Sequence, residues 1–125
     1  MSKVKLFTIA VADRPGTVAS AIRSLAAAGV NVLSVLGWGP AGVVEIVTDN
    51  PVKAKKALDT VGVAHQQGSA EIVELPNKPG ALLTFLDGLA KKNVNLRSLC
   101  ATTSKGGRKA VLVWTVNPTA PTRQI

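Results

Sequence analysis

The apolar positions of this 125-residue chain follow two different periods in turn. Apolar residues at every second position predict half-buried strands, and apolar residues three and four positions apart predict amphipathic helices. On this basis strands are expected at residues 5–12, 31–37, 43–48, 63–68, 70–75, 95–102 and 110–116. Helices are expected at residues 15–28, 52–61 and 79–92.

The pattern repeats once along the chain, at an offset of 64 residues. Asp13-Arg14-Pro15-Gly16 returns as Asn77-Lys78-Pro79-Gly80, and Val30-Asn31-Val32 returns as Val94-Asn95-Leu96. No gap is needed between residues 11 and 34 of the first copy. Two unrelated helices can share an apolar spacing, but they do not also share both flanking motifs. The chain is therefore predicted to hold two copies of one module.

The motif before each helix has a local physical explanation. Proline in a first helical turn loses no hydrogen bond, because its N–H would have no intrahelical partner. Asp13 and Asn77 stand where an N-cap side chain accepts a bond from a free backbone N–H. Gly29 and Asn93 are expected to end the two helices. Glycine-rich segments at 37–42 and 104–107 predict hairpins.

The two copies differ in length. Residues 1–69 read βαββαβ, which is an α+β ferredoxin-like unit with its helices on one face of an antiparallel sheet. Residues 70–117 read βαββ, so the second copy is truncated by a helix and an edge strand. Two prolines make residues 118–125 a tail. An incomplete copy leaves an apolar face and a strand edge uncovered, so we expect a homodimer or a larger assembly.

A strand, Asx-x-Pro-Gly, an amphipathic helix and Gly-Val-Asn-Val before a second strand together resemble the ACT domain. Two copies in register resemble the small stand-alone tandem ACT proteins of bacteria, along nearly the whole chain. The resemblance implies a regulatory role, with an amino acid or analogue bound near the strand–helix turn at an interface between ACT units. It also implies a possible client enzyme or transporter. The site maps onto Asp13, Gly16, Thr17, Asn31, Asn77, Gly80, Ala81 and Asn95.

These residue types suit such a ligand. Gly16 and Gly80 allow a close backbone approach, and the N–H groups of a helix N-terminus favour a carboxylate. Asp13 is able to accept an α-ammonium group, and the amides of Asn31 and Asn95 offer donors and acceptors. A purely structural explanation is also open, in which Asp13 and Asn77 only cap helices and the glycines only permit tight packing.

The two candidate sites are not chemically identical. Asp13 in one copy stands against Asn77 in the other, so the copies can bind differently, or only one can bind. The truncation makes the second copy the weaker candidate. Apolar residues surround both turns and favour an aliphatic or aromatic amino acid over a charged one. These residues are Val11, Val18, Leu75 and Leu82.

The chain is basic, with a net charge of +8, and this raises the possibility of nucleic acid binding. RNA-recognition motifs share the βαββαβ order, but they stack bases on aromatic side chains of their first and third strands. Here the first copy offers only Phe7 and the second only Trp114 on those strands. Weak, non-specific nucleic acid binding stays an alternative. A third possible function is that of a regulatory or structural subunit that binds no ligand.

No catalytic constellation is evident. His65 and Cys100 are the only residues of their types. A Cys–His nucleophile pair is conceivable, but a buried Cys100 and a surface or strand-end His65 are favoured. The carboxylates, His65 and Cys100 show no metal-ligand spacing, and the glycines of residues 37–42 fit neither a dinucleotide nor a phosphate loop. We predict a non-enzymatic protein without cofactor or metal.

The expected compartment is the cytoplasm. A single cysteine excludes an intramolecular disulfide framework, which fits a reducing environment. The alternating start of the chain is more typical of a strand than of a signal peptide. No apolar run approaches the roughly 18 residues that a membrane helix requires, so no membrane association is expected.

Overall fold

The computed structural model describes residues 2–116, and the chain divides into two compact units. The first unit comprises Val4–Ser69. The second unit comprises the described residues from Ala70 onward, together with Ser2 and Lys3. The tail expected at 118–125 lies outside the described residues.

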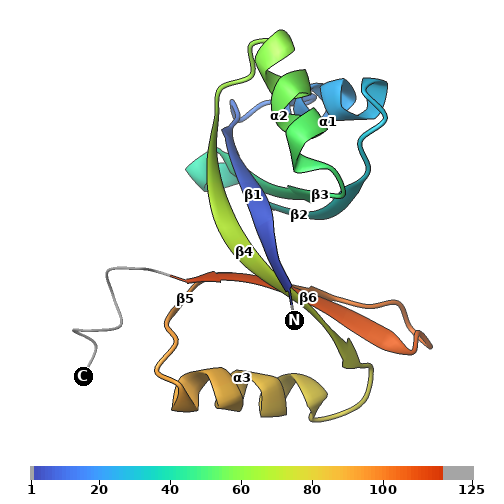
Figure 1. The fold of residues 1–125 in the computed structure, drawn as a ribbon, viewed down its shortest axis with the longest axis vertical. Helices are drawn as coiled ribbons and strands as arrows, with labels where there is room; N and C mark the ends of the chain where they lie inside the picture. Colours follow the sequence, from blue (N-terminus) through green and yellow to red (C-terminus); the bar gives the residue numbers. More distant parts are fainter. Residues whose placement is uncertain (1, 117–125) are drawn as a thin grey trace. The chain divides into compact units, whose positions relative to one another are not determined.

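The described elements follow one another in the order that Figure 1 shows. They are β1 (Ser2–Ala10), α1 (Thr17–Ala27), β2 (Val32–Trp38), the 3-10 turn η1 (Gly39–Ala41), β3 (Val43–Thr48), α2 (Pro51–Thr60), β4 (His65–Pro76), α3 (Ala81–Lys91), β5 (Leu96–Thr102) and β6 (Lys109–Val116).

The first unit is an α+β ferredoxin-like structure, as the sequence predicts. Its strands are ordered β2-β3-β1-β4, and β3 pairs antiparallel with both β1 and β2. The contacting helices α1 and α2 lie on the same face of this sheet (Figure 1). The helices are held there because their apolar stripes bury against alternate strand residues. The core comprises Phe7, Ile9, Ala21, Leu25, Val30, Val44, Ile46, Ala54 and Leu58.

The second unit has the strand order β4-β6-β5, with antiparallel pairing and α3 packed on one face. Its core contains Leu89, Leu112 and Trp114, and the ring of Phe85 meets that of Trp114 edge-on at 5.1 Å. β1 is the other neighbour of β4, and its first residues cluster with this unit. The described part of the unit thus has a strand beside β4 but only one helix.

The repeat in the sequence is visible in the elements. α1 spans Thr17–Ala27 and α3 spans Ala81–Lys91, a displacement of 64 residues at both ends. β2 and β5 are displaced by the same number. Both helices end as predicted, because Gly29 (φ 75°) and Asn93 (φ 61°) take the left-handed conformation that stops a helix.

One predicted boundary between strands is wrong. The strands expected at 63–68 and 70–75 are a single strand, β4, which runs from His65 to Pro76. Gly68 and Ser69 are compatible with a turn, but no Asx-Gly or proline enforces one there. The chain therefore stays extended through both residues. The remaining strand bounds lie within three residues of those expected.

The predicted starts of α1 and α3 are also wrong, and so are the predicted caps. Both helices begin two residues later, and their N-caps are Gly16 (φ 87°) and Gly80 (φ 86°), without a side-chain cap bond. A left-handed residue cannot lie inside a right-handed helix, so each Pro-Gly pair belongs to the preceding turn. Asn77 instead donates its side-chain amide to the carbonyl of Gly107 at 2.7 Å.

Replacing a cap glycine is expected to strain the backbone without any clash. A Cβ at Gly16 or Gly80 would meet nothing within 4 Å, yet left-handed backbone costs an L-residue about 1–2 kcal/mol. Gly16→Ala and Gly80→Ala should each lower the free energy of unfolding by about that amount in urea. Gly88→Ala is the matched control, because Gly88 lies inside α3 with equally open surroundings. It should stabilise by roughly 0.5–1 kcal/mol. Equal effects for Gly16 and Gly88 would contradict the assignment.

Candidate functional site

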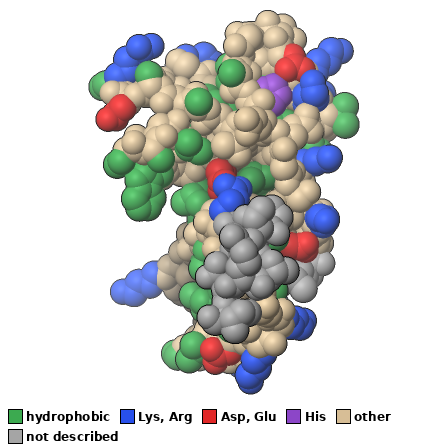
Figure 2. Space-filling model, turned by 90° about the vertical axis from the view of Figure 1, so that its left-hand side faces the viewer, with side chains coloured by type: hydrophobic (Ala, Val, Ile, Leu, Met, Phe, Trp, Pro, Cys, Tyr) green, Lys and Arg blue, Asp and Glu red, His purple; other side chains and the backbone are tan. Residues whose placement is uncertain are grey.

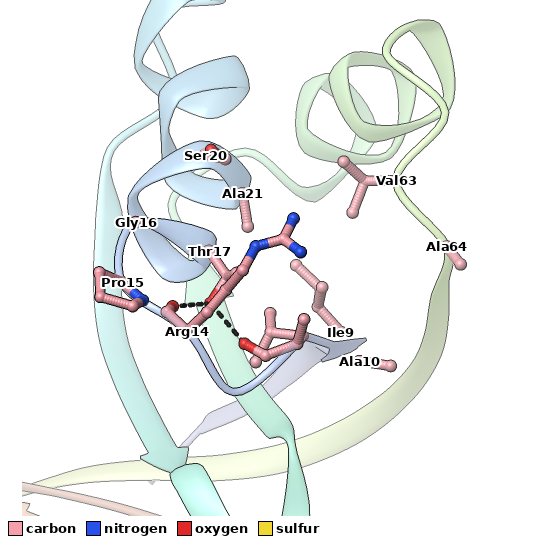
Figure 3. Close-up of a pocket in the computed structure, with 12 residues that line it drawn as sticks. Ile9, Ala10, Arg14, Pro15, Gly16, Thr17, Ser20, Ala21, Val63 and Ala64 are labelled. Carbon is pink, nitrogen blue, oxygen red and sulfur yellow. Dashed lines mark hydrogen bonds between the residues drawn. The ribbon is translucent and has the colours of Figure 1, made fainter.

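An open cleft of about 440 Å³ lies in the first unit, at the turn between β1 and α1. One wall is formed by the end of β1, the turn and the first part of α1. Val63 and Ala64, which precede β4, form the facing wall (Figure 3). The pocket therefore lies where a strand end, a helix start and the α2–β4 connection meet.

The turn that shapes this cleft is held by its own hydrogen bonds. The hydroxyl of Thr17 donates to the carbonyl of Ala12 at 2.8 Å and to that of Arg14 at 3.2 Å, as dashed lines show in Figure 3. The backbone N–H of Arg14 also donates to Ala12 at 2.9 Å. Because Gly16 has no side chain, the first N–H groups of α1 have no side-chain cap. Such groups carry the positive end of the helix dipole and favour anions.

Arg14 supplies the charge in the cleft. Its guanidinium extends into the space between α1 and Val63 (Figure 3). The side chain has no ion-pair partner among residues 2–116. A guanidinium is suited to bind a carboxylate with two parallel hydrogen bonds. Our sequence reasoning did not select Arg14, although the position between Asx and Pro is basic in both copies, as Arg14 and Lys78.

The rest of the lining is mainly apolar or small. Ile9, Val11, Ala21 and Val63 all line the cleft. Val11 was expected to form an apolar wall, and it does line the cleft. Val18 was expected beside it, but Val18 is not among the lining residues and is 40% exposed.

The structure brings together only some of the predicted first-unit residues. Gly16 and Thr17 line the cleft with Arg14. Asp13 does not line it and faces η1 instead, where a Cβ on Gly39 would lie 4.0 Å from its carboxylate oxygen. Asn31 lies beyond the far end of α1, and its backbone N–H and carbonyl both bond Asp49 at 3.0 Å.

The predicted second-unit residues are also dispersed. Asn77 lines a separate cleft of about 240 Å³ in that unit, together with Lys78. Gly80 and Ala81 form the start of α3 and do not line this cleft, and neither does the half-buried Asn95. Leu75 and Leu82, expected as an apolar wall, do line it.

His65 lies at the start of β4 as predicted, but it is not on the surface. Its side chain is only 8% exposed, and its ring meets that of Phe7 edge-on at 5.7 Å. Nδ1 lies 2.9 Å from the carbonyl of Val63, and Nε2 lies 3.6 Å from Asp59. Packing on Phe7 and the α2–β4 connection therefore buries it. Cys100 is half-buried on β5, in the other unit.

The comparisons with known proteins place the fold. No protein-family model matches the chain, and no curated protein is similar to it in sequence. Protein BT0572 from Bacteroides thetaiotaomicron superimposes with a TM-score of 0.82 at 21% identity, over 92% of this chain and 80% of that one. The ligand-free regulatory subunit of aspartate kinase from Thermus thermophilus gives 0.65 at 18% identity, over 90% and 82%. The chain has an ACT-like α+β fold.

A more distant match extends the comparison to a ligand complex. Escherichia coli aspartokinase III, in complex with lysine and aspartate, gives a TM-score of 0.61 at 14% identity. The match covers 96% of this chain but only 29% of the enzyme. At these identities the similarity establishes the ACT-like fold and leaves the ligand to be argued from the residues.

The described residues contain neither a group of metal ligands nor a membrane-spanning helix. Between residues 2 and 116 no three histidine, cysteine or carboxylate side chains are grouped so that they could hold a metal ion. No helix in the same range is long and apolar enough to cross a membrane.

The ion pair beside His65 yields a pH-dependent prediction. The Lys55 ammonium donates to Asp59 at 2.6 Å and lowers the pKa of that carboxyl below its usual value. Stability from a lowered carboxyl pKa is present above the unfolded-state value and is lost as the pH falls through the folded-state value. Lys55→Met should therefore raise the pKa of Asp59, measured by carbon NMR of its carboxyl group. Lys56→Met is the control, and an unchanged pKa with Met at position 55 would contradict the pairing.

Proposed function

We propose that this protein is a non-enzymatic regulatory protein that binds an amino acid or a close analogue in the β1–α1 cleft of its first unit. The observation that carries the proposal is Arg14, whose guanidinium extends into a cleft at the uncapped start of α1 and has no ion-pair partner among residues 2–116. Two cationic features that converge on one small space favour a carboxylate.

The cleft also matches the rest of such a ligand. Its volume of about 440 Å³ lies within the usual range of small-molecule sites. Ile9, Val11 and Val63 offer apolar contact to a side chain, so an aliphatic or aromatic amino acid is favoured over a charged one.

The α-ammonium group requires an acceptor, and no acidic side chain lines the cleft from within the unit. We propose that the acceptor is contributed across an interface between ACT-like units. The candidates for this contribution are the predicted residues outside the cleft, namely Asp13, Asn31, Asn77, Gly80, Ala81 and Asn95. Asp13 is the strongest of them, because a carboxylate is the natural partner of an ammonium group.

The regulatory part of the proposal rests on the ACT-like fold. One matching structure is named as a regulatory subunit of aspartate kinase. Another is an aspartokinase bound to lysine and aspartate. By analogy we propose that the ligand changes how this chain acts on a client enzyme or transporter.

Base stacking of the kind used by RNA-recognition motifs is disfavoured by the burial of the aromatic side chains on β1 and β6. Phe7 is 1% exposed and Trp114 is 3% exposed, so neither presents a ring on which a base can stack. On the face in Figure 2, lysine and arginine side chains are scattered, and some of them adjoin acidic side chains. Any binding should therefore be weak, non-specific and sensitive to salt.

We expect the protein to form a homodimer through its second unit. Leu83 of α3 is 63% exposed, and the described part of the unit has no second helix beside α3. Light scattering at micromolar concentration should show a dimer, and Leu83→Glu should weaken it by placing a charge in the apolar contact. Val52→Glu on α2, where Val52 is 81% exposed, should leave it unchanged. A monomeric wild type would disprove the dimer.

Amino acids at millimolar concentration should stabilise the fold in a thermal scan. A ligand that binds only the native state adds about 2.7 kcal/mol at a hundredfold excess over Kd, and branched-chain and aromatic members should act first. Arg14→Gln removes a charge-assisted hydrogen bond of roughly 1.5–3 kcal/mol, so Kd should rise about ten- to hundredfold.

Arg23→Gln is the matched control for this experiment. Arg23 is exposed on the same helix and does not line the cleft, so its removal should leave Kd unchanged. Absence of any stabilisation by the panel would count against ligand sensing and favour the ligand-free subunit. Equal effects of the two arginine variants would mean that binding occurs elsewhere.

A further inference from the structure

We propose that the second unit carries a ligand site of a different kind, on the opposite side of the repeated turn, and that it binds a short apolar carboxylic acid. This site is the cleft of about 240 Å³ bordered by Leu75, Lys78, Leu82, Thr102 and Leu112. The proposal goes beyond the function given above, because it does not depend on occupation of the first cleft.

The position of the second cleft follows from the repeat. Each turn leaves a strand, β1 or β4, and enters a helix, α1 or α3. The first cleft opens on the side of β1 that faces the α2–β4 connection. The second opens toward the end of β5 and the start of β6, which correspond to β2 and β3 in the first unit. The same motif therefore borders two clefts that are not equivalent.

A hydrogen-bonded frame holds the second cleft open. The side-chain amide of Asn77 donates to the carbonyl of Gly107 at 2.7 Å, and its backbone N–H donates to Arg108 at 3.0 Å. Thr103 closes the same hairpin by donating its hydroxyl to Lys109 at 2.7 Å. These bonds tie the β4–α3 turn to the β5–β6 hairpin. The cleft is thus bounded by backbone that the fold itself fixes.

The lining determines the chemistry of the ligand. Leu75, Leu82 and Leu112 make an apolar surface, and Leu112 is fully buried beneath it. Among the described residues, Lys78 is the one charged residue of the lining and has no ion-pair partner. A lysine on the border of an apolar cleft favours an anion with a short hydrocarbon tail.

Two further features separate this ligand from that of the first cleft. The volume is little more than half as large, about 240 Å³ against 440 Å³. Gly80 and Ala81, the counterparts of Gly16 and Thr17, do not line it. As in the first cleft, no acidic side chain among the described residues lines it, so the smaller volume is what favours a ligand without an α-ammonium group. A carboxylic acid without an amino group fits better than an amino acid.

The test uses proton–nitrogen NMR of the full chain, with glycine amides as local reporters. Gly16 lines the first cleft, and Gly107 is bonded to the rim of the second. Isobutyrate should shift Gly107 and Lys78 in a saturable manner, and any shift at Gly16 should follow a separate binding curve. Isobutyramide, which has the same shape without the charge, should bind at least tenfold more weakly. L-valine should not shift Gly107.

Variants at repeat-related positions separate the two sites. Lys78→Gln should weaken isobutyrate binding about tenfold or more, whereas Arg14→Gln should leave it unchanged. Leu82→Asn should weaken it as well, and Val18→Asn, 64 residues earlier and outside both clefts, should not. Lys78 and Leu82 are both exposed, so these variants are expected to fold, which the dispersion of the same spectra verifies.

The results that would overturn the proposal are distinct from those that bear on the first cleft. If isobutyrate up to tens of millimolar causes no shift at Gly107, the proposed site in the second cleft is ruled out. A shift at Gly16 instead would assign the acid to the first cleft. An equal response of Gly107 to L-valine would show that the ligand class is wrong. A response of Gly16 to amino acids tests only the proposed function and is read independently in the same spectra.

Discussion

Everything in this protein depends on how the chain leaves a central strand and enters a helix within a few residues. Gly16 and Gly80 make this possible by taking a left-handed conformation, which turns the backbone sharply enough for the helix to lie back over its sheet. The apolar stripes of α1 and α3 reach their cores only because of that turn. The same glycines leave the helix starts without side-chain caps. The turn that the fold requires therefore also leaves backbone N–H donors available at the first turns of α1 and α3.

Much of this arrangement is predictable from the sequence, because periodicity and repetition are strong signals. The helices, the hairpins and the helix ends at Gly29 and Asn93 follow from them. The caps do not, since Asp13 and Asn77 have the right chemistry for a cap and only the φ angle of the next glycine excludes it. The continuity of β4 through Gly68 and Ser69 was missed for a similar reason. These residues permit a turn, and pairing with neighbouring strands decides against it.

The candidate site was harder to predict because its walls come from distant parts of the chain. Gly16 and Thr17 were identified through the motif, but Val63 enters the cleft from beyond α2 and has no local signature. Arg14 could have been found by comparing the two Asx-x-Pro-Gly motifs, because the corresponding residue, Lys78, is also basic. A search for periodic apolar positions does not detect such a pair. Asn31 has the residue type expected of a ligand contact, yet it is engaged with Asp49 at the other end of α1. Residue type alone does not reveal which end of a helix faces a pocket.

The unbroken course of β4 has a consequence for where this molecule can be divided. Most repeated modules are joined by exposed linkers, where proteases cut and where domains are recombined. Here the boundary between units falls between Ser69 and Ala70, inside a single strand. Division at that point would sever the strand and deprive both halves of part of their sheets. The two units therefore share one strand and are not joined by a linker, despite their separate cores.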